Sequence, residues 1–140
     1  MADTGTCESC KQQFSYALIH NGFNESAYAY CDACGCTAVF SAWSPVPDGV
    51  SIGFHRCIES EVEPHLRPCG CGGRFRAGAA PRCPRCRRPL SAEVAAAYLE
   101  ANAPGTAKGW RWQRNWIGLY SIIVEGRRVE APWITRPAPP

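Results

Sequence analysis

Four cysteine pairs constrain the fold of this 140-residue chain more than any other feature. Three pairs have C-x-x-C spacing and one has C-x-C spacing; they are Cys7 and Cys10, Cys31 and Cys34, Cys69 and Cys71, and Cys83 and Cys86. A C-x-x-C turn presents two sulfurs to one ion, and two such turns complete the tetrahedron that Zn²⁺ prefers. Each half of the chain is too small for a hydrophobic core alone to stabilise it well. We therefore expect these eight cysteines to bind two structural Zn²⁺ ions.

The spacing also predicts how the pairs combine. The first two pairs are separated by twenty residues. Alternating apolar residues on both sides of the Asn21-Gly22 turn signal predict a β-hairpin between them. The last two pairs are separated by eleven residues, and the glycines beside Cys71 relieve crowding in a tight turn. One ion is therefore expected within residues 1–49, and a second within residues 68–90.

The remaining segments are expected to add strands and one short helix. Residues 37–43 are rich in β-branched and aromatic side chains and predict a third strand. Residues 50–67 form an acidic connector, interpreted as a strand followed by a loop. Ser91 is a favourable N-cap for a helix over residues 91–103.

The C-terminal part is expected to be a tryptophan-rich β segment over residues 104–133 and a loose tail over 134–140. Its last two strands flank Glu125-Gly126, which predicts a C-terminal β-hairpin. On a strand Trp110, Trp112 and Trp116 would share one face, and we favour a role for them in the core over one in base stacking. The expected fold is thus small, metal-stabilised and β-rich (α+β).

Both cysteine segments resemble zinc ribbons, the rubredoxin-like fold group in which two cysteine turns hold one ion at the end of a small sheet. The resemblance covers about residues 7–44 and 68–90. It implies two zinc ribbons, with iron as an alternative to zinc, because rubredoxins bind iron in similar turns. The C-x-C pair departs from the pattern, which makes His65 a candidate substitute ligand.

The whole chain also resembles small uncharacterised bacterial double zinc-ribbon proteins. Zinc ribbons occur in transcription factors, polymerase subunits, ribosomal proteins and enzymes, so the resemblance implies no single activity.

No catalytic motif accompanies the cysteines. The chain lacks H-E-x-x-H, G-x-S-x-G, a glycine loop followed by lysine, and the zinc-deaminase signature. Four cysteines close a zinc site, whereas catalytic zinc keeps an open position. Cys36 and Cys57 are interpreted as small buried hydrophobes, the alternative being a third site or a redox pair with His55. The sequence therefore favours a non-catalytic protein over an enzyme or a redox protein.

Charge is divided unevenly along the chain. Residues 1–65 contain two basic and eight acidic residues, whereas residues 66–140 contain thirteen basic and four acidic ones. Seven arginines lie in residues 67–88. Zn²⁺ with four thiolates carries a net charge of about −2, so about five of these charges remain for another anion. That anion is either a phosphate backbone or an acidic patch of the same chain or of a neighbouring copy, made of Asp48, Glu59, Glu61 and Glu63.

The expected function is that of a non-catalytic adaptor or nucleic-acid-binding module, with RNA or single-stranded DNA favoured. The alternative is a protein–protein interaction module, or a subunit of a larger complex, that uses opposed acidic and basic faces. The candidate binding residues are Arg74, Arg76, Arg82, Arg85, Arg87, Arg88, Arg111 and Arg114. With no long apolar stretch and no signal-peptide pattern, we expect a cytoplasmic protein without a membrane partner.

Overall fold

The computed structural model describes residues 3–90 and 120–134 of the chain. The predicted helix over 91–103, the three tryptophans at 110, 112 and 116, and most of the predicted tail lie outside these residues. The elements within them are β1 (Asp3–Thr6), β2 (Gln13–His20), β3 (Ser26–Cys31), β4 (Thr37–Ser41), the 3₁₀ helix η1 (Ser60–His65), β5 (Phe75–Arg76), β6 (Tyr120–Val124) and β7 (Arg128–Glu130).

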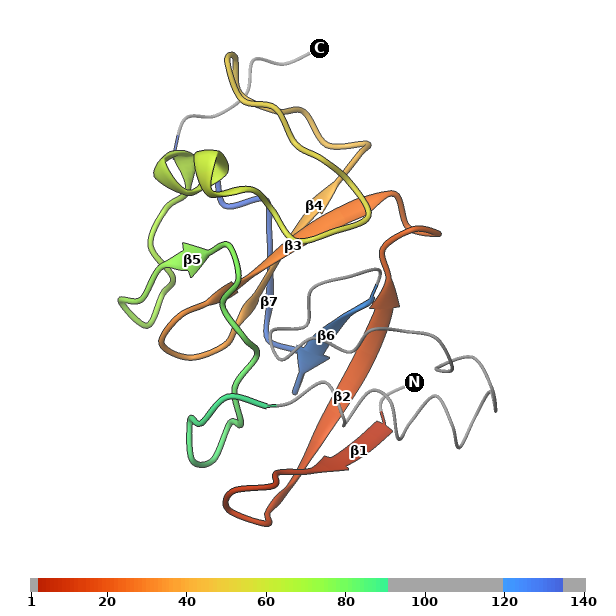
Figure 1. The fold of residues 1–140 in the computed structure, drawn as a ribbon, viewed down its shortest axis with the longest axis vertical. Coiled ribbons are helices and arrows are strands. Elements are labelled where there is room, and N and C mark those ends of the chain that lie inside the picture. The colour runs from red at the N-terminus through yellow and green to blue at the C-terminus, as the bar shows by residue number, and fades with distance from the viewer. Residues whose placement is uncertain (1–2, 91–119, 135–140) are drawn as a thin grey trace.

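The strands form two small sheets (Figure 1). One is antiparallel with the order β1-β2-β6, and the other has the order β5-β3-β4-β7. Within the second sheet β3 is antiparallel to both β4 and β5, and β7 runs parallel to β4. The described part of the chain is thus β-rich, as expected, and none of its helices is long and apolar enough to cross a membrane.

The hairpin predicted between the first two cysteine pairs is not formed. The chain does turn at Asn21, whose carbonyl accepts a hydrogen bond from the Ser26 N–H at 3.0 Å, but β2 and β3 then enter different sheets. The physical reason is the burial of β3, all six residues of which are buried. A strand covered on both faces and paired on both edges lies in the middle of a structure, not in a peripheral hairpin.

The C-terminal hairpin is also absent, although both of its strands exist. Glu125 and Gly126 have φ of 50° and 70°, and the Arg127 N–H bonds the Val124 carbonyl at 3.0 Å. This tight turn carries the chain from one sheet to the other, since β6 pairs with β2 and β7 pairs with β4. In the acidic connector, Cys57 forms one isolated bridge with Tyr28. Glu59 is the N-cap of η1, and Glu61 and Glu63 lie within it.

The core has one cluster around Phe14, Tyr30 and Ile122 and another around Phe40 and Trp133. Tyr30 is fully buried, and its hydroxyl accepts a hydrogen bond from the Ile122 N–H at 3.1 Å. Burial raises the pKa of Tyr30 well above its usual value, so the phenol stays neutral. This bond ties β6 of one sheet to β3 of the other, next to Cys31 at the end of β3.

Candidate metal centres

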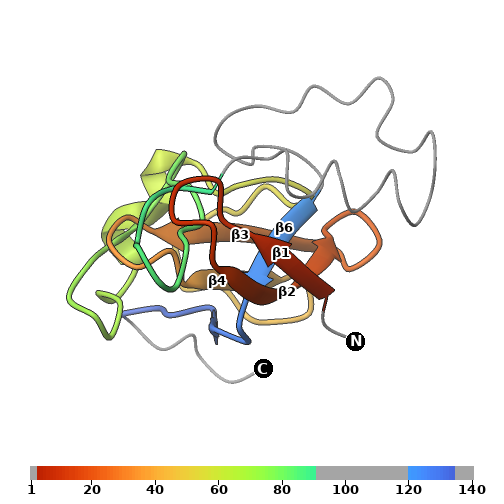
Figure 2. The same cartoon turned by 90° about the horizontal axis from the view of Figure 1, so that it is seen from below.

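Site 1 consists of Cys7, Cys10, Cys83 and Cys86, whose sulfurs all lie within 4.8 Å of one another. The Sγ atoms of Cys7 and Cys86 are 3.7 Å apart, as are those of Cys10 and Cys83. Such edges match a tetrahedron with metal–sulfur bonds of about 2.3 Å. In two perpendicular views the loop of residues 7–12, at the lower end of β2 in Figure 1, lies beside the loop of residues 83–88 (Figures 1 and 2).

Site 2 consists of Cys31, Cys34, Cys69 and Cys71, again within 4.8 Å of one another. The Sγ distances are 3.6 Å for Cys31 to Cys71 and 3.6 Å for Cys34 to Cys69. Cys31 and Cys34 are buried whereas Cys71 is exposed. Site 2 therefore has the geometry of site 1 but is open to solvent on the side of the C-x-C turn.

The structure brings together all eight predicted cysteines but corrects their grouping. The prediction joined the first pair to the second and the third to the fourth; in the structure the first pair joins the fourth, and the second joins the third. Strand pairing is the cause. Strand β2 directly follows the 7–12 turn, and it belongs to a different sheet from β3. The 7–12 turn therefore does not lie beside Cys31, which is at the end of β3. Instead β5 pairs with β3, setting Phe75 opposite Cys31 and bringing the 69–73 turn to site 2.

The three C-x-x-C turns share one backbone pattern. In each, the residue after the second cysteine donates its N–H to the carbonyl of the first cysteine, at 2.9–3.0 Å. That residue has a positive φ in every case: 64° for Lys11, 75° for Gly35 and 64° for Arg87. The N–H of the first cysteine bonds the carbonyl of the next residue along, Gln12, Cys36 or Arg88. In each C-x-x-C turn, a local structure of six residues, closed by its own hydrogen bonds, therefore presents the two sulfurs.

The C-x-C turn is one residue shorter and relies on glycine. Gly72 has a φ of 94°, and its N–H bonds the Cys69 carbonyl at 2.8 Å. A Cβ on Gly73 would lie 2.6 Å from Cys31 Sγ, closer than real Cβ contacts. The expectation that glycine relieves crowding is confirmed for Gly73 alone; Gly72 is needed for its φ, and a Cβ on Gly70 would meet nothing within 4 Å.

The thiols of each cluster differ in acidity. The Gly73 N–H is the largest influence on Cys71 and helps lower its pKa to about 7. Burial raises the pKa of Cys31 to about 12 and that of Cys69 to about 11. In site 1 burial acts to raise the pKa of Cys7, but hydrogen bonds from the backbone of Cys10 and Ser9 and from Cys86 outweigh it and lower the value to about 7.

Four thiolates this close repel one another, so full ionisation needs a bound cation. An all-sulfur donor set suits zinc or iron and not calcium or magnesium.

The other candidate ligands lie outside both clusters. His65 is exposed and belongs to neither, so the proposal that it substitutes for a cysteine is wrong. Cys36 is buried among apolar residues, which agrees with its interpretation as a small buried hydrophobe. Cys57 packs against both cores but is only partly buried. All ten cysteines are free thiols in the structure.

The arginines of the second half divide into paired and unpaired ones. Arg76 contacts Asp32 at 2.9 Å and Glu63 at 3.3 Å, and Arg85 contacts Glu125 at 3.1 Å. Arg82 donates from Nη1 to the Arg87 carbonyl at 2.7 Å.

Arg74, Arg87 and Arg88 are exposed and make no ion pair with another described residue. Arg111 and Arg114 lie outside the described residues.

Sequence reasoning missed Lys11 and Arg127. Lys11 directly follows the second cysteine of the first pair, as Arg87 follows that of the fourth pair. This equivalent position in the sequence could have identified Lys11 as a candidate binding residue. Arg127 donates from Nη2 to the Cys34 carbonyl at 2.9 Å. Together with the bond between Arg85 and Glu125, this makes the β6–β7 turn a bridge between the turns of the two sites.

A family model described as a domain of unknown function (DUF8255) matches residues 3–92. The chain belongs to this family. The match begins at β1 and ends just beyond the 83–88 turn, and it includes all eight cysteines of sites 1 and 2, so both clusters lie within the family domain. Comparisons with curated proteins and with solved structures gave no significant match.

Proposed function

We propose that this chain is a non-catalytic adaptor in which two Zn²⁺ ions, one in each cluster, hold ribbon-like cysteine turns that bind single-stranded nucleic acid, RNA or DNA. The contact surface is the cationic rim of site 1, made of Lys11, Arg87 and Arg88. Each cluster supports a closed, structural ion because it supplies four sulfurs and leaves no position for a substrate.

The backbone of Lys11 and Arg87 carries this proposal. Both residues have a φ of 64°, at the position where site 2 has Gly35. A side chain in this left-handed conformation costs about 1 kcal/mol or more, which glycine avoids. Costly conformations of this kind cluster where function requires them. Two long cations at equivalent positions of one metal site are most simply explained by a common anionic ligand.

The charges of the described residues support the same conclusion. The acidic patch considered from the sequence engages only one of the arginines of residues 67–88, through the contact of Glu63 with Arg76. Glu59 instead contacts Arg56 at 3.2 Å. The rim of site 1 forms no ion pair with a described residue. No carboxylate of the described residues neutralises these charges, so the part that the thiolates of site 1 do not offset is available to phosphate groups, to which arginine in particular binds in a bidentate manner.

The proposal is tested by fluorescence anisotropy with labelled U20 RNA and dT20 DNA over a series of salt concentrations. Each lost phosphate contact should reduce the salt slope by about 0.7 for a single strand. Lys11→Gly and Arg87→Gly should each weaken binding several-fold while leaving stability unchanged or slightly higher, because they relieve the backbone strain. Arg128→Ala is the control, since Arg128 is paired with Glu130 on β7.

Two results would contradict the proposal. One is the absence of binding to either probe at low salt. The other is that Lys11→Gly and Arg87→Gly bind U20 and dT20 with unchanged affinity but retain metal less well. The positive charges of the rim would then serve only to offset the negative charge of the thiolates in site 1.

A further inference from the structure

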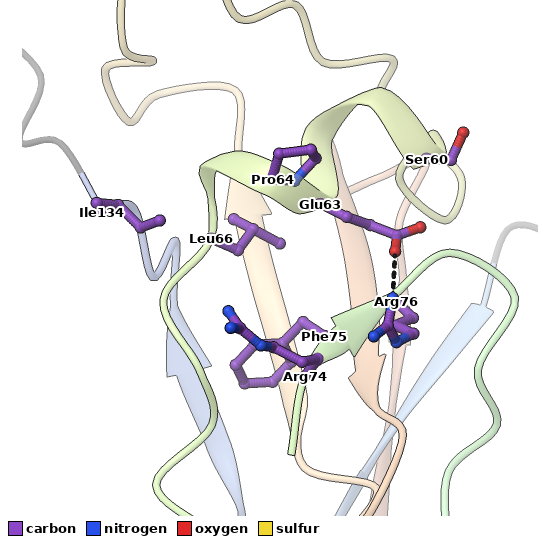
Figure 3. Close-up of a pocket in the computed structure, with 8 residues that line it drawn as sticks. All are labelled: Ser60, Glu63, Pro64, Leu66, Arg74, Phe75, Arg76 and Ile134. Carbon is purple, nitrogen blue, oxygen red and sulfur yellow. Dashed lines mark hydrogen bonds and ion pairs between the residues drawn. The ribbon is translucent and has the colours of Figure 1, made fainter. Parts of the chain in front are cut away.

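A pocket lies along the free edge of β5. Strand β5 is the terminal strand of its sheet, and the opposite wall of the pocket is formed by Ser60, Glu63 and Pro64 of η1 (Figure 3). Its volume is about 550 Å³, which falls within the range of ligand-binding pockets. Ile134, 56% exposed, adds apolar surface, whereas the lining residue Leu66 is buried.

The backbone of Phe75 faces this pocket. The Asp32 N–H bonds the Arg74 carbonyl at 2.8 Å, which makes these two residues a hydrogen-bonded pair between β3 and β5. Hydrogen-bonded and non-bonded pairs alternate in antiparallel strands, so the N–H and C=O of Phe75 point away from β3. Two residues further along the same edge, Glu63 accepts the Ala77 N–H at 3.1 Å. The Phe75 groups are thus left for an added strand.

The two arginines of the pocket have different roles. Arg76 is held by Asp32 and Glu63, as described above, and forms part of the wall. Arg74 lines the pocket, its guanidinium extends toward Leu66 in Figure 3, and it makes no ion pair with a described residue. The pocket therefore combines one available cation, one free backbone donor–acceptor pair and an apolar floor.

We propose that this pocket binds a short extended peptide of a partner protein, which adds to the edge of β5. The Phe75 backbone would bond the peptide backbone, an acidic side chain would pair with Arg74, and a neighbouring apolar side chain would contact the exposed Ile134. A nucleic acid fits less well, because the Glu63 carboxylate in the wall repels phosphate and the Phe75 carbonyl needs a donor. Combined with the rim of site 1, the pocket makes the chain a two-sided adaptor.

The test is selection of a random dodecapeptide library on the immobilised, metal-loaded protein. Enriched peptides should contain Asp or Glu within two residues of an aliphatic or aromatic residue. The best peptide, synthesised with a fluorescein label, should bind with a dissociation constant on the order of 10–100 µM, as expected for a short segment that must order on binding. Arg74→Glu should weaken it at least 10-fold, and Ile134→Asp several-fold.

Arg88→Ala provides the matched control, since it removes an equally exposed arginine from site 1 and should change peptide affinity less than 2-fold. Replacing the acidic residue of the peptide by its amide should have little further effect on the Arg74→Ala variant, because the two changes remove the same contact. Melting curves and a metal content of two ions per chain establish that each variant is folded.

The proposal is overturned if no peptide is enriched, or if Arg74→Glu leaves peptide binding intact. It is also overturned if Arg74→Glu weakens binding of U20 and dT20 while no peptide binds, since the pocket would then belong to the nucleic-acid surface. Loss of nucleic-acid binding in the Lys11 and Arg87 variants alone leaves the peptide result unaffected, so the two proposals fail separately.

Discussion

Replacing Gly35 by alanine should disturb both metal sites through a single contact. Gly35 belongs to the 31–36 turn of site 2 and has a φ of 75°. A Cβ at this position would lie 2.3 Å from the Arg82 backbone nitrogen, and Arg82 directly precedes Cys83 of site 1. The added methyl group must therefore push the two cysteine turns apart.

The loss of unfolding free energy in Gly35→Ala has two parts. The left-handed backbone costs alanine about 1–2 kcal/mol, partly offset by the smaller conformational freedom of alanine in the unfolded chain. Overpacking against a backbone atom typically adds about 1–3 kcal/mol. We expect a total of about 2–4 kcal/mol, a large share of the stability of a small domain. Gly49→Ala is the matched control, because Gly49 has a φ of 80° but nothing within 4 Å of its added Cβ.

The free energy of unfolding is measured by urea denaturation of the metal-loaded protein, and metal content by elemental analysis. Gly49→Ala should cost only the backbone part, about 1 kcal/mol, and retain two ions. Gly35→Ala should cost more and lose metal from both sites. Equal unfolding free energies for the two variants, or loss of only one ion from Gly35→Ala, would refute the reasoning.

Three further outcomes follow from the same geometry. Gly73→Ala should leave one ion per chain by elemental analysis, because its Cβ would displace Cys31 Sγ, whereas Gly70→Ala meets nothing within 4 Å and should retain two. The affinity of site 2 for metal should fall as pH falls, because Cys31 and Cys69 have raised pKa values of about 12 and about 11 and must each release a proton to bind. In competition with a chelating dye between pH 8 and 6, the logarithm of the metal association constant should fall by at least about two for each pH unit. An association constant that does not change with pH would contradict this. Arg85→Ala should cost no more than about 1 kcal/mol in a thermal melt, because its pair with Glu125 is partly exposed; a larger loss would show that the β6–β7 turn supports site 1 more strongly than its contact indicates.

Local features of the fold were predictable from the sequence, and long-range ones were not. A C-x-x-C turn is fixed by hydrogen bonds within six residues, so its spacing alone identified six of the eight cysteines of the two sites, and the shorter C-x-C spacing identified Cys69 and Cys71. Strand β4 and the turn at Glu125-Gly126 depend equally on nearby residues, and both were predicted.

The pairing of the strands depends on which surfaces are buried together. Asn21 illustrates the difference. Its turn signal was read correctly, but its side chain is fully buried and accepts hydrogen bonds from Ser26 at 3.0 Å and Ser121 at 3.3 Å. It thus serves as a junction between sheets and not as the tip of a hairpin. No pattern within the surrounding residues distinguishes these two roles.

The grouping of the cysteine turns also affects the entropy cost of closing each metal site. Site 2 closes a loop between Cys34 and Cys69, 35 positions apart, and this loop lies wholly inside the one that site 1 closes between Cys10 and Cys83, 73 positions apart. Once the inner ion is bound, only the twenty residues before Cys31 and the eleven before Cys83 remain free within the outer loop. Each halving of a flexible loop lowers its closure cost by about 0.6 kcal/mol. Capture of the inner ion therefore shortens the free part of the outer loop by about one halving, and this difference of about 0.6 kcal/mol modestly favours binding of the inner ion first.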